Sequence, residues 1–533
     1  MAAHPHYQRN IGATSRKQKE FRRDMTQIRA STRTARKTVM SALAALEKAS
    51  LSVLKDPRLF REYAYVDGSW IAAEDGAFVD VTDPATGARI GCVPALSAAE
   101  TAAAIDAAHA GFGPWSARLP QERARILRDW HDLILSARED LARLMVLEQG
   151  KPLQEAQGEI DYAASFVEFY AEEAKRVNVE SVTSHLPGAD MQVVREPAGV
   201  AGLVTPWNFP SAMLTRKAAA ALAAGCTVVA HPSSETPFSA LALAELAERA
   251  GIPAGVFNVV TGEAPEVVGA MTAARNVRVL SFTGSTEIGR LLYARSAPTI
   301  KKLVMELGGH APFIAFADCD LDRAVDSAIA AKFATSGQDC LAANRFYIER
   351  SIYDAFVRAF ADKVRAMRVG NGMTHPDIGP LINEKAVAKQ ETHVADALSK
   401  GARLVVGGRA SNAGPNFFEP TILADVSDDA AIFREETFGP VAAFTCFDAE
   451  NDAVSRANDT ETGLVAYLHT TDPARIARLS RRLEFGMVAV NRTKITGAPV
   501  PFGGVKQAGL GREGSRLGME AYTNVKYICR DAG

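Results

Sequence analysis

The sequence predicts an α/β fold in which a doubly wound parallel sheet precedes a second α/β domain. Between Val200 and Gly309, short apolar runs alternate with helical patterns about every 25 residues, which is typical of β-α-β units. A similar but less regular alternation continues from Ala311. The chain has 533 residues, of which 47% are hydrophobic and 23% charged, so it can fill the cores of two or three domains.

Three helices are predicted before the sheet, and each has a recognisable boundary. A capping box from Ser97 to Glu100 begins the first, over 102–110, while Pro120 begins the second and Gly150 ends the third. The faces that should be buried carry apolar residues at helical spacing: Ile126, Trp130 and Leu133 in the second helix, and Leu141, Leu144 and Met145 in the third.

The parallel sheet is predicted from five apolar runs joined by four helical segments. The strands are 200–205, 227–230, 256–261, 277–282 and 303–307, and the helices are 213–224, 239–250, 265–274 and 287–294. Ligands of such sheets bind at the carboxyl ends of the strands. For the second domain we expect a strand at 313–316, a helix at 321–333, a strand near Cys340 and a helix at 353–368.

Residues 1–45 are predicted to form a basic, disordered extension. The first 40 residues hold ten Lys or Arg against Glu20 and Asp24, which leaves 50 basic and 60 acidic residues, a net charge of −10, in the rest. The segment is also rich in Ser, Thr and Arg, as mitochondrial transit peptides are, and an upstream start codon before Met40 is a further interpretation. We therefore expect a cytoplasmic protein, or a mitochondrial matrix protein if the segment is a transit peptide.

Composition excludes several classes of protein. No apolar run reaches the roughly 18 to 20 residues that a membrane span needs. The six cysteines are far apart and form no CxxC pair, so we expect neither a disulfide framework nor a metal site, and a reducing compartment fits best. Only the basic tail is typical of nucleic-acid binding, and we expect no nucleic-acid partner.

A loop of small residues, 336–340, presents the Cys340 thiol before the apolar run Phe346-Tyr347-Ile348. A free thiol has a pKa of roughly 8.5, so Cys340 needs a cation, a helix terminus or a base to be a thiolate at neutral pH. By itself, the residue is either a nucleophile or an inert, small apolar cysteine.

The loop after 277–282 is a candidate anion site. It reads Phe282-Thr-Gly-Ser285-Thr-Glu-Ile288-Gly289 and opens a helix, whose backbone N–H groups can bind a pyrophosphate together with the Ser285 hydroxyl. The spacing G-x-x-x-x-G differs from the dinucleotide fingerprint G-x-G-x-x-G, so a tight turn without a ligand is equally consistent.

Two polar residues lie in apolar surroundings at strand ends. Asn208, between Trp207 and Phe209, needs partners if it is buried, and it either caps the next helix or donates to a developing oxyanion. Glu306 ends the strand 303–307, where burial should raise the pKa of its carboxyl and make it a base. A thiol, an amide donor, a base and a dinucleotide-type fold together favour aldehyde oxidation: a thiohemiacetal forms, hydride leaves to nicotinamide, and activated water hydrolyses the thioester.

Six motifs in this order resemble the aldehyde dehydrogenase superfamily, from about residue 56 to the end. They are Thr205-Pro-Trp-Asn-Phe-Pro210, Phe282-Thr-Gly-Ser285, Glu306-Leu-Gly-Gly309, Gly337-Gln-Asp-Cys340, Glu435-Glu-Thr-Phe-Gly-Pro440 and Pro501-Phe-Gly-Gly504. Four more stretches are most similar to succinate-semialdehyde dehydrogenases: Leu147-Glu-Gln-Gly-Lys-Pro152, Ser211-Ala-Met-Leu-Thr-Arg-Lys217, Thr236-Pro-Phe-Ser-Ala240 and Gly511-Arg-Glu-Gly-Ser515.

The resemblance implies a division of the chain and a role for each matching residue. It implies a dinucleotide-binding domain (56–182 and 199–307), a catalytic domain (308–490) and a small β oligomerisation element (183–198 and 491–533) of a homodimer or homotetramer. The catalytic residues would be Cys340 as nucleophile, Glu306 as the base for the deacylating water, Asn208 with the Cys340 backbone N–H as oxyanion site, and Lys217 assisting nearby. For the cofactor, NADP or NAD, Trp207 and Ser285 would hold the pyrophosphate, Glu436 and Phe438 the nicotinamide ribose and ring, and further contacts would come from Thr205, His231, Ser234, Gly262, Phe282, Gly284, Ile288 and Leu307.

The chain departs from the family pattern at both ends of the site. At the adenosine end, relatives carry a lysine and, when NAD is preferred, an acid three residues later; this chain has His231 and Ser234 at these positions. Without the acid there is no repulsion toward a 2′-phosphate, so NADP should be used at least as well as NAD. A neutral His231 is, however, a weaker partner for that phosphate than lysine. Arg216 matches one arginine that grips the distal carboxylate in succinate-semialdehyde enzymes. The second such arginine falls at Ala334 and a loop serine near Gly497; Arg492 and Lys494 either supply replacement charge or are solvated.

Other interpretations remain less consistent with the residues. A CoA-acylating relative has less need of a hydrolytic base such as Glu306, and a non-catalytic scaffold has no reason to keep Cys340, Glu306 and Asn208 together. Ala342 stands where some relatives have a second cysteine, which excludes a regulatory disulfide of that pair. The expected substrate is succinate semialdehyde or a similar carboxylate-bearing aldehyde; a different small aldehyde is the alternative.

Overall fold

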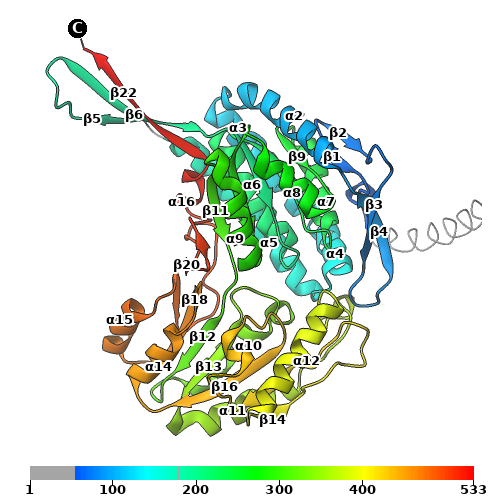
Figure 1. Ribbon diagram of the computed structural model, residues 1–533, viewed down its shortest axis with the longest axis vertical. Coiled ribbons are helices and arrows are strands. Elements are labelled where there is room, and N and C mark those ends of the chain that lie inside the picture. The colour runs from blue at the N-terminus through cyan, green and yellow to red at the C-terminus, as the bar shows by residue number, and fades with distance from the viewer. Residues whose placement is uncertain (1–53, 178, 533) are drawn as a thin grey trace, which may run out of the picture. The chain divides into compact units, whose positions relative to one another are not determined.

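The computed structural model describes residues 54–177 and 179–532 (Figure 1). The extension predicted at 1–45 lies outside them. Contacts divide the chain before Asp56, and all features below belong to the unit Asp56–Gly533. In the described part of the chain, no helix is both long and apolar enough to cross a membrane.

An eight-stranded sheet forms the core of the N-terminal half of this unit. The strand order is β2-β1-β9-β8-β7-β10-β11-β21, and the strands from β9 to β11 run parallel. The bounds are β1 Ala64–Val66, β2 Ser69–Ile71, β7 Val200–Val204, β8 Thr227–His231, β9 Phe257–Val259, β10 Val277–Thr283, β11 Lys302–Glu306 and β21 Gly509–Leu510. The five predicted strands are confirmed within two residues, whereas the sequence does not predict the two- and three-residue antiparallel strands, which are too short for a periodic signal.

Helices cover both faces of this sheet, as a parallel sheet requires. Their bounds are α2 Ala98–Ser116, α3 Pro120–Ser136, α4 Arg138–Gln149, α5 Leu153–Glu173, α6 Pro210–Ala224, α7 Pro237–Arg249, α8 Ala264–Ala273 and α9 Thr286–Ser296. The predicted capping box of Ser97 and Glu100 begins α2. Gly150 ends α4 with a φ of 90°, a conformation that glycine adopts without a steric penalty.

A seven-stranded sheet follows, in the order β14-β15-β16-β13-β12-β18-β19, and only the β14–β15 pair is antiparallel. The strands are β12 Ala311–Ala315, β13 Ala343–Glu349, β14 Arg403–Val406, β15 Thr421–Ala424, β16 Val441–Phe447, β18 Val465–His469 and β19 Met487–Val490. The helices are α10 Leu321–Phe333, α11 Arg350–Arg365, α12 Glu384–Ser399, α13 Ala431–Arg434, α14 Glu450–Asn458 and α15 Pro473–Arg482. The strand expected near Cys340 begins three residues later, so Cys340 lies in the turn before β13.

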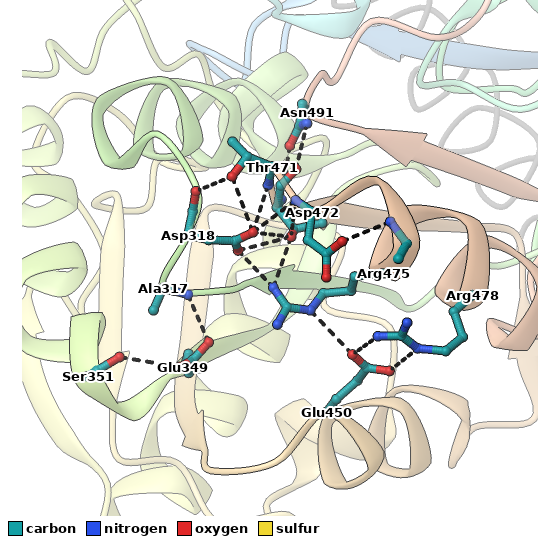
Figure 2. Close-up of polar contacts among 12 residues, drawn as sticks. Ala317, Asp318, Glu349, Ser351, Glu450, Thr471, Asp472, Arg475, Arg478 and Asn491 are labelled. Carbon is teal, nitrogen blue, oxygen red and sulfur yellow. Dashed lines mark hydrogen bonds and ion pairs between the residues drawn. The ribbon is translucent and has the colours of Figure 1, made fainter.

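Asp318 ties together the ends of two neighbouring strands of this sheet, β12 and β18 (Figure 2). Its carboxylate accepts hydrogen bonds from the Thr470 hydroxyl at 2.8 Å and from the backbone N–H groups of Thr471 and Asp472 at 3.0 and 2.9 Å. Arg475 donates to it at 2.9 Å and continues to Glu450. This cluster fixes the start of α15 against the sheet.

A separate small sheet combines two strands that precede β7 in the sequence with the last strand of the chain, in the order β22-β6-β5. Their bounds are β5 Glu180–Val182, β6 Ala189–Pro197 and β22 Thr523–Asp531. In Figure 1 they lie side by side and extend away from the helices around the eight-stranded sheet. Two further strand pairs, β3 Phe78–Thr82 with β4 Arg89–Pro94 and β17 Thr462–Gly463 with β20 Val505–Lys506, and the short helix α16 Leu517–Glu520 complete the unit.

Candidate active site

A cavity of about 1020 Å³ opens where the carboxyl ends of β7, β10 and β11 meet the turn before β13. Nine of the predicted site residues line it: Trp207, Asn208, Arg216, Gly284, Ser285, Leu307, Cys340, Glu436 and Phe438. The place agrees with the rule that ligands of parallel sheets bind at the carboxyl ends of the strands.

The loop that carries Cys340 has an unusual backbone. Thr335, Ser336 and Gly337 have φ values of 50°, 57° and 75°, in the left-handed region. A β-branched residue such as Thr335 rarely adopts this conformation, so surrounding contacts must hold it. The Thr335 backbone N–H donates to Glu155 Oε2 at 2.8 Å, and the Ile382 backbone N–H donates to the side chain of Gln338 at 2.9 Å. The turn before Cys340 is therefore fixed on both sides.

The Cys340 thiol is protonated in this environment. Burial raises its pKa well above the usual value, and the nearby acids Asp339 and Glu436 raise it further, while Arg216 acts in the opposite direction. A cation that favours the thiolate is thus present in Arg216, but burial and the two acids outweigh its effect on the pKa of Cys340.

Asn208 faces the nucleophile loop. Its Nδ2 donates to the backbone carbonyl of Gln338 at 3.0 Å. The alternative that Asn208 caps the following helix is wrong, because the side chain of Glu159 takes that place: its Oε1 accepts the backbone N–H groups of Ser211 and Ala212 at 3.0 and 3.1 Å.

Glu306 ends β11 and is 2% exposed. Neither carboxylate oxygen has a hydrogen-bond partner among the described residues. Burial raises the pKa of this carboxyl well above its usual value, and the charge of Glu513 raises it further. The expected raised pKa is therefore confirmed.

At the cavity wall, Arg216, which lines the cavity, and Lys217, which does not, share one buried carboxylate. Arg216 Nε lies 2.6 Å from Glu513 Oε2, and Lys217 Nζ donates to Glu513 Oε1 and, at 2.7 Å, to the Thr283 hydroxyl. The Arg216 guanidinium also lies 4.2 Å from the centroid of the Phe502 ring. The role of Glu513 is not predictable from the sequence, since a lone acid in a glycine-rich stretch carries no local signal of burial.

The cofactor end of the cavity combines two rings, an acid and a helix N-terminus. The rings of Trp207 and Phe438 are 5.4 Å apart and nearly perpendicular. Glu436 Oε1 accepts the backbone N–H of Gly309 at 3.0 Å, and burial raises the pKa of this carboxyl to about 7. Ser285 accepts the Ile288 N–H at 3.3 Å, which leaves its hydroxyl proton free to donate to an anion at the start of α9. These residues fit a dinucleotide.

The residues predicted at the adenosine end do not line the cavity. His231 is buried with Nδ1 at 3.2 Å from the Val260 carbonyl, and burial lowers its pKa to about 4, so it is neutral at pH 7. Ser234 is exposed. Of the remaining predicted contacts, Thr205, Gly262 and Phe282 are buried, whereas Ile288 is exposed.

At the substrate end, the structure corrects one prediction. Arg492 is exposed and does not line the cavity, whereas Lys494 of the same segment does, between Thr493 and Thr496. The chain bends after β19, which turns Arg492 to solvent. Ala334 stands at the position of an expected arginine and lines the cavity, where it supplies no positive charge.

Comparisons with known proteins identify the family. The model of the aldehyde dehydrogenase family matches residues 70–528. The chain is 54% identical to the non-phosphorylating aspartate-semialdehyde dehydrogenase of Halomonas elongata (90% of this chain, 97% of the relative) and 53% identical to the NADP(+) succinate-semialdehyde dehydrogenase of Escherichia coli (89% and 99%). A crystal structure of an E. coli NADP-dependent enzyme has a TM-score of 0.89 at 53% identity, covering 90% of this chain and 100% of that one. The chain therefore belongs to the aldehyde dehydrogenase family and is an NAD(P)-dependent oxidoreductase.

Proposed function

We propose that this enzyme oxidises a small carboxylate-bearing aldehyde, with succinate semialdehyde as the first candidate, to the carboxylic acid. The observation that carries the proposal is that Cys340, Asn208 and Arg216 line one cavity: a thiol, an amide donor and a guanidinium that can form charge-assisted hydrogen bonds with a carboxylate. The names of two relatives that are over half identical, aspartate- and succinate-semialdehyde dehydrogenase, support the same class of substrate.

In this proposal Cys340 is the nucleophile. Its sulfur forms a bond to the aldehyde carbon while the thiol proton leaves to solvent, and the Asn208 amide and the Cys340 backbone N–H stabilise the oxygen that becomes negative. NADP or NAD, held by Trp207, Ser285, Glu436 and Phe438, supplies the hydride acceptor when bound.

Glu306 serves as the base in the second half of the reaction. Its carboxylate takes a proton from the water that attacks the thioester carbon; the carbon–sulfur bond then breaks, and the acid and the free thiol are released. Because burial keeps the Glu306 carboxyl protonated to a higher pH than usual, this step needs the fraction that is ionised. Lys217 lies close enough to bias that ionisation through its charge.

For the cofactor, we propose that NADP is used at least as well as NAD. Neither His231 nor Ser234 supplies a carboxylate that would repel a 2′-phosphate, and the E. coli relative is named for NADP(+). Steady-state kinetics with both cofactors test this proposal. A kcat/KM more than about tenfold higher with NAD would contradict it, because a tenfold ratio corresponds to about 1.4 kcal/mol, the net free energy of one hydrogen bond.

A second substrate candidate is aspartate semialdehyde, which carries an ammonium beside its carboxylate. Glu155 and Asp161 line the same cavity as Arg216 and offer carboxylates to such a group. Asp161 is already paired with Arg138 at 2.6 Å and Glu155 Oε2 accepts the Thr335 N–H at 2.8 Å, so the other oxygen of Glu155 would be the main partner.

The substrate proposal is tested with a panel of aldehydes of matched length. Succinate semialdehyde, aspartate semialdehyde and butyraldehyde are each assayed with NADP and NAD. A higher kcat/KM for the two carboxylate-bearing aldehydes than for butyraldehyde supports the proposal, and equal values for all three would refute it. The ratio between the two semialdehydes then decides which is preferred.

We also propose a cytoplasmic homodimer or homotetramer. The three-stranded sheet supports this assembly, because Val525 and Tyr527 on β22 are 62% and 55% exposed and Val182 on β5 is 45% exposed, which is unusual for large apolar residues. Light scattering of the intact chain and of a chain ending before Thr523 tests the proposal. A monomeric intact chain would contradict it.

A further inference from the structure

A buried ion pair holds the Asn208 turn from behind. Lys151 Nζ lies 2.5 Å from Glu159 Oε2 and donates to the backbone carbonyl of Asn208 at 2.7 Å. The two charged side chains are 0% and 1% exposed. The ammonium also lies 4.1 Å from the centroid of the Phe209 ring. No step of the proposed reaction uses this pair.

The pair acts on both ends of the turn. Lys151 holds the carbonyl at its start, while the second oxygen of Glu159 accepts the Ser211 and Ala212 N–H groups at its end, in the first turn of α6. A carboxylate at a helix N-terminus and a cation on a carbonyl are both favourable arrangements. The backbone of Asn208 therefore has little freedom to move.

The segment of Lys151 also supports the nucleophile loop. A Cβ on Gly379 would lie 2.5 Å from the carbonyl oxygen of Gly150, so these two backbones are in direct contact. The Gly379 N–H donates to the Ser336 hydroxyl at 2.9 Å, in the loop that leads to Cys340. Asn208 and Cys340 thus share one support, although they come from different sheets.

We propose that Lys151 is a positioning residue: by fixing the Asn208 backbone, it aims the Asn208 amide at the substrate oxygen bound beside Cys340. The inference rests on the proposed role of Asn208. Packing alone does not require charge here, because buried ion pairs can often be replaced by apolar residues of similar volume without loss of stability.

The test uses a variant that leaves no unpaired charge. Lys151→Met alone would strand the Glu159 carboxylate, so the main variant is Lys151→Met with Glu159→Gln, in which the glutamine oxygen still accepts the Ser211 and Ala212 N–H groups. We expect kcat to fall by about 10- to 100-fold, a smaller loss than removal of an oxyanion donor itself causes. The KM for the aldehyde, the Kd for NADPH and the rate of Cys340 alkylation by iodoacetamide should change by less than about threefold, since ground-state binding and the thiol are left in place.

Coupling to Asn208 separates a positioning role from a structural one. If Lys151 acts through Asn208, adding Asn208→Ala to the double variant lowers kcat no further than Asn208→Ala alone does. Losses that multiply, or an unchanged kcat in the double variant, would overturn the proposal. Asn208→Ala without effect would overturn both this proposal and the assigned role of Asn208.

Lys301→Met is the matched control. Lys301 is also a largely buried ammonium that donates to backbone carbonyls, but these belong to Ala274 and Val277 and not to the Asn208 turn. Its kcat should stay within about twofold of the original, which shows that loss of such a lysine does not by itself slow the enzyme. All assays use whichever aldehyde of the panel is oxidised fastest, so failure of the substrate proposal and failure of this one give different results.

Discussion

Lys217 and Glu513 are 296 residues apart in the chain, and their side chains form a buried ion pair behind the cavity wall. The same carboxylate pairs with Arg216, so one acid offsets two cations. Its charge is also the largest cause, after burial, of the raised pKa of Glu306. The ionisation of the proposed base therefore depends on a residue near the end of the chain.

Glu513→Gln should shift the pH dependence of the reaction. Without the negative charge of Glu513, the positive charges of Arg216 and Lys217 act unopposed on Glu306, and its pKa falls. We expect the acidic limb of the kcat–pH profile to move down by roughly one pH unit. The measurement is stopped-flow absorbance at a series of pH values. The steady-state rate that follows the burst of NADPH reports on deacylation, the step in which Glu306 is the proposed base.

Glu245→Gln is the control for that variant. Glu245 is likewise a buried carboxylate shared by two cations, Arg61 and Arg249, but it lies outside the cavity. Both variants should lower the thermal midpoint, since each removes a buried carboxylate that two cations share. Only Glu513→Gln should shift the profile; the same shift in both variants would contradict the assignment.

Gly309→Ala should inactivate the enzyme without unfolding it. A Cβ at this position would lie 2.2 Å from the carbonyl oxygen of Cys340, and a backbone atom cannot move aside without displacing the nucleophile. We expect kcat to fall by about 100-fold or more, as misplacement of a reacting group does. Steady-state assays beside cofactor-binding titrations measure this.

Gly308→Ala gives the comparison. The nearest atoms to its Cβ would be Glu436 Oε2 at 3.2 Å and Thr286 Oγ1 at 3.4 Å, and these side chains can shift more easily than a backbone carbonyl. We expect the KM for NADP to rise, while the rate of Cys340 alkylation changes little. Equal losses of kcat in the two variants would show that the Gly309 contact has no special effect.

Arg216→Met should discriminate between charged and uncharged aldehydes. A charge-assisted hydrogen bond contributes about 1.5–3 kcal/mol, so kcat/KM for succinate semialdehyde should fall by about 10- to 100-fold. Butyraldehyde has no carboxylate and reports any general damage from the loss of the Glu513 partner. A parallel loss for both aldehydes would mean that Arg216 supports the site rather than the substrate.

Buried histidines, His231 and His469 among them, should make the stability of the fold decline in mild acid, and His469 gives a test. This residue is 3% exposed and stacks on Phe313, and burial lowers its pKa to about 4. An unfolded histidine has a pKa of about 6.5, so between pH 6.5 and 4 the unfolded state binds the proton and the folded state does not. The contribution is intact above pH 6.5 and decreases by up to about 3 kcal/mol as the pH falls to 4. His469→Gln should flatten the fall of the thermal midpoint over this range, and an unchanged slope would contradict the prediction.

Sequence patterns predicted the parts of the molecule that depend on local regularity. The strands β7 to β11 and the helices between them follow from apolar spacing, and Cys340, Asn208 and Glu306 follow from chemistry at strand ends. Arg492 was misplaced because charge near a motif says nothing about the direction in which a loop turns. No local pattern predicts the contact of Lys151 with the Asn208 carbonyl or of Glu513 with Lys217, because these residues are 57 and 296 positions apart and only the folded chain brings them together.

The pairing of β22 with β6 has a consequence for how the protein is made. The ladder runs through nine register pairs, from Thr523 opposite Pro197 to Asp531 opposite Ala189. Translation proceeds from the N-terminus, so one edge of β6 cannot form its ladder with β22 until β22 has been synthesised. Open strand edges pair with one another, and neighbouring ribosomes on one messenger RNA would carry chains with the same open edge. During the interval between synthesis of β6 and of β22, this edge is therefore open to pairing with another chain.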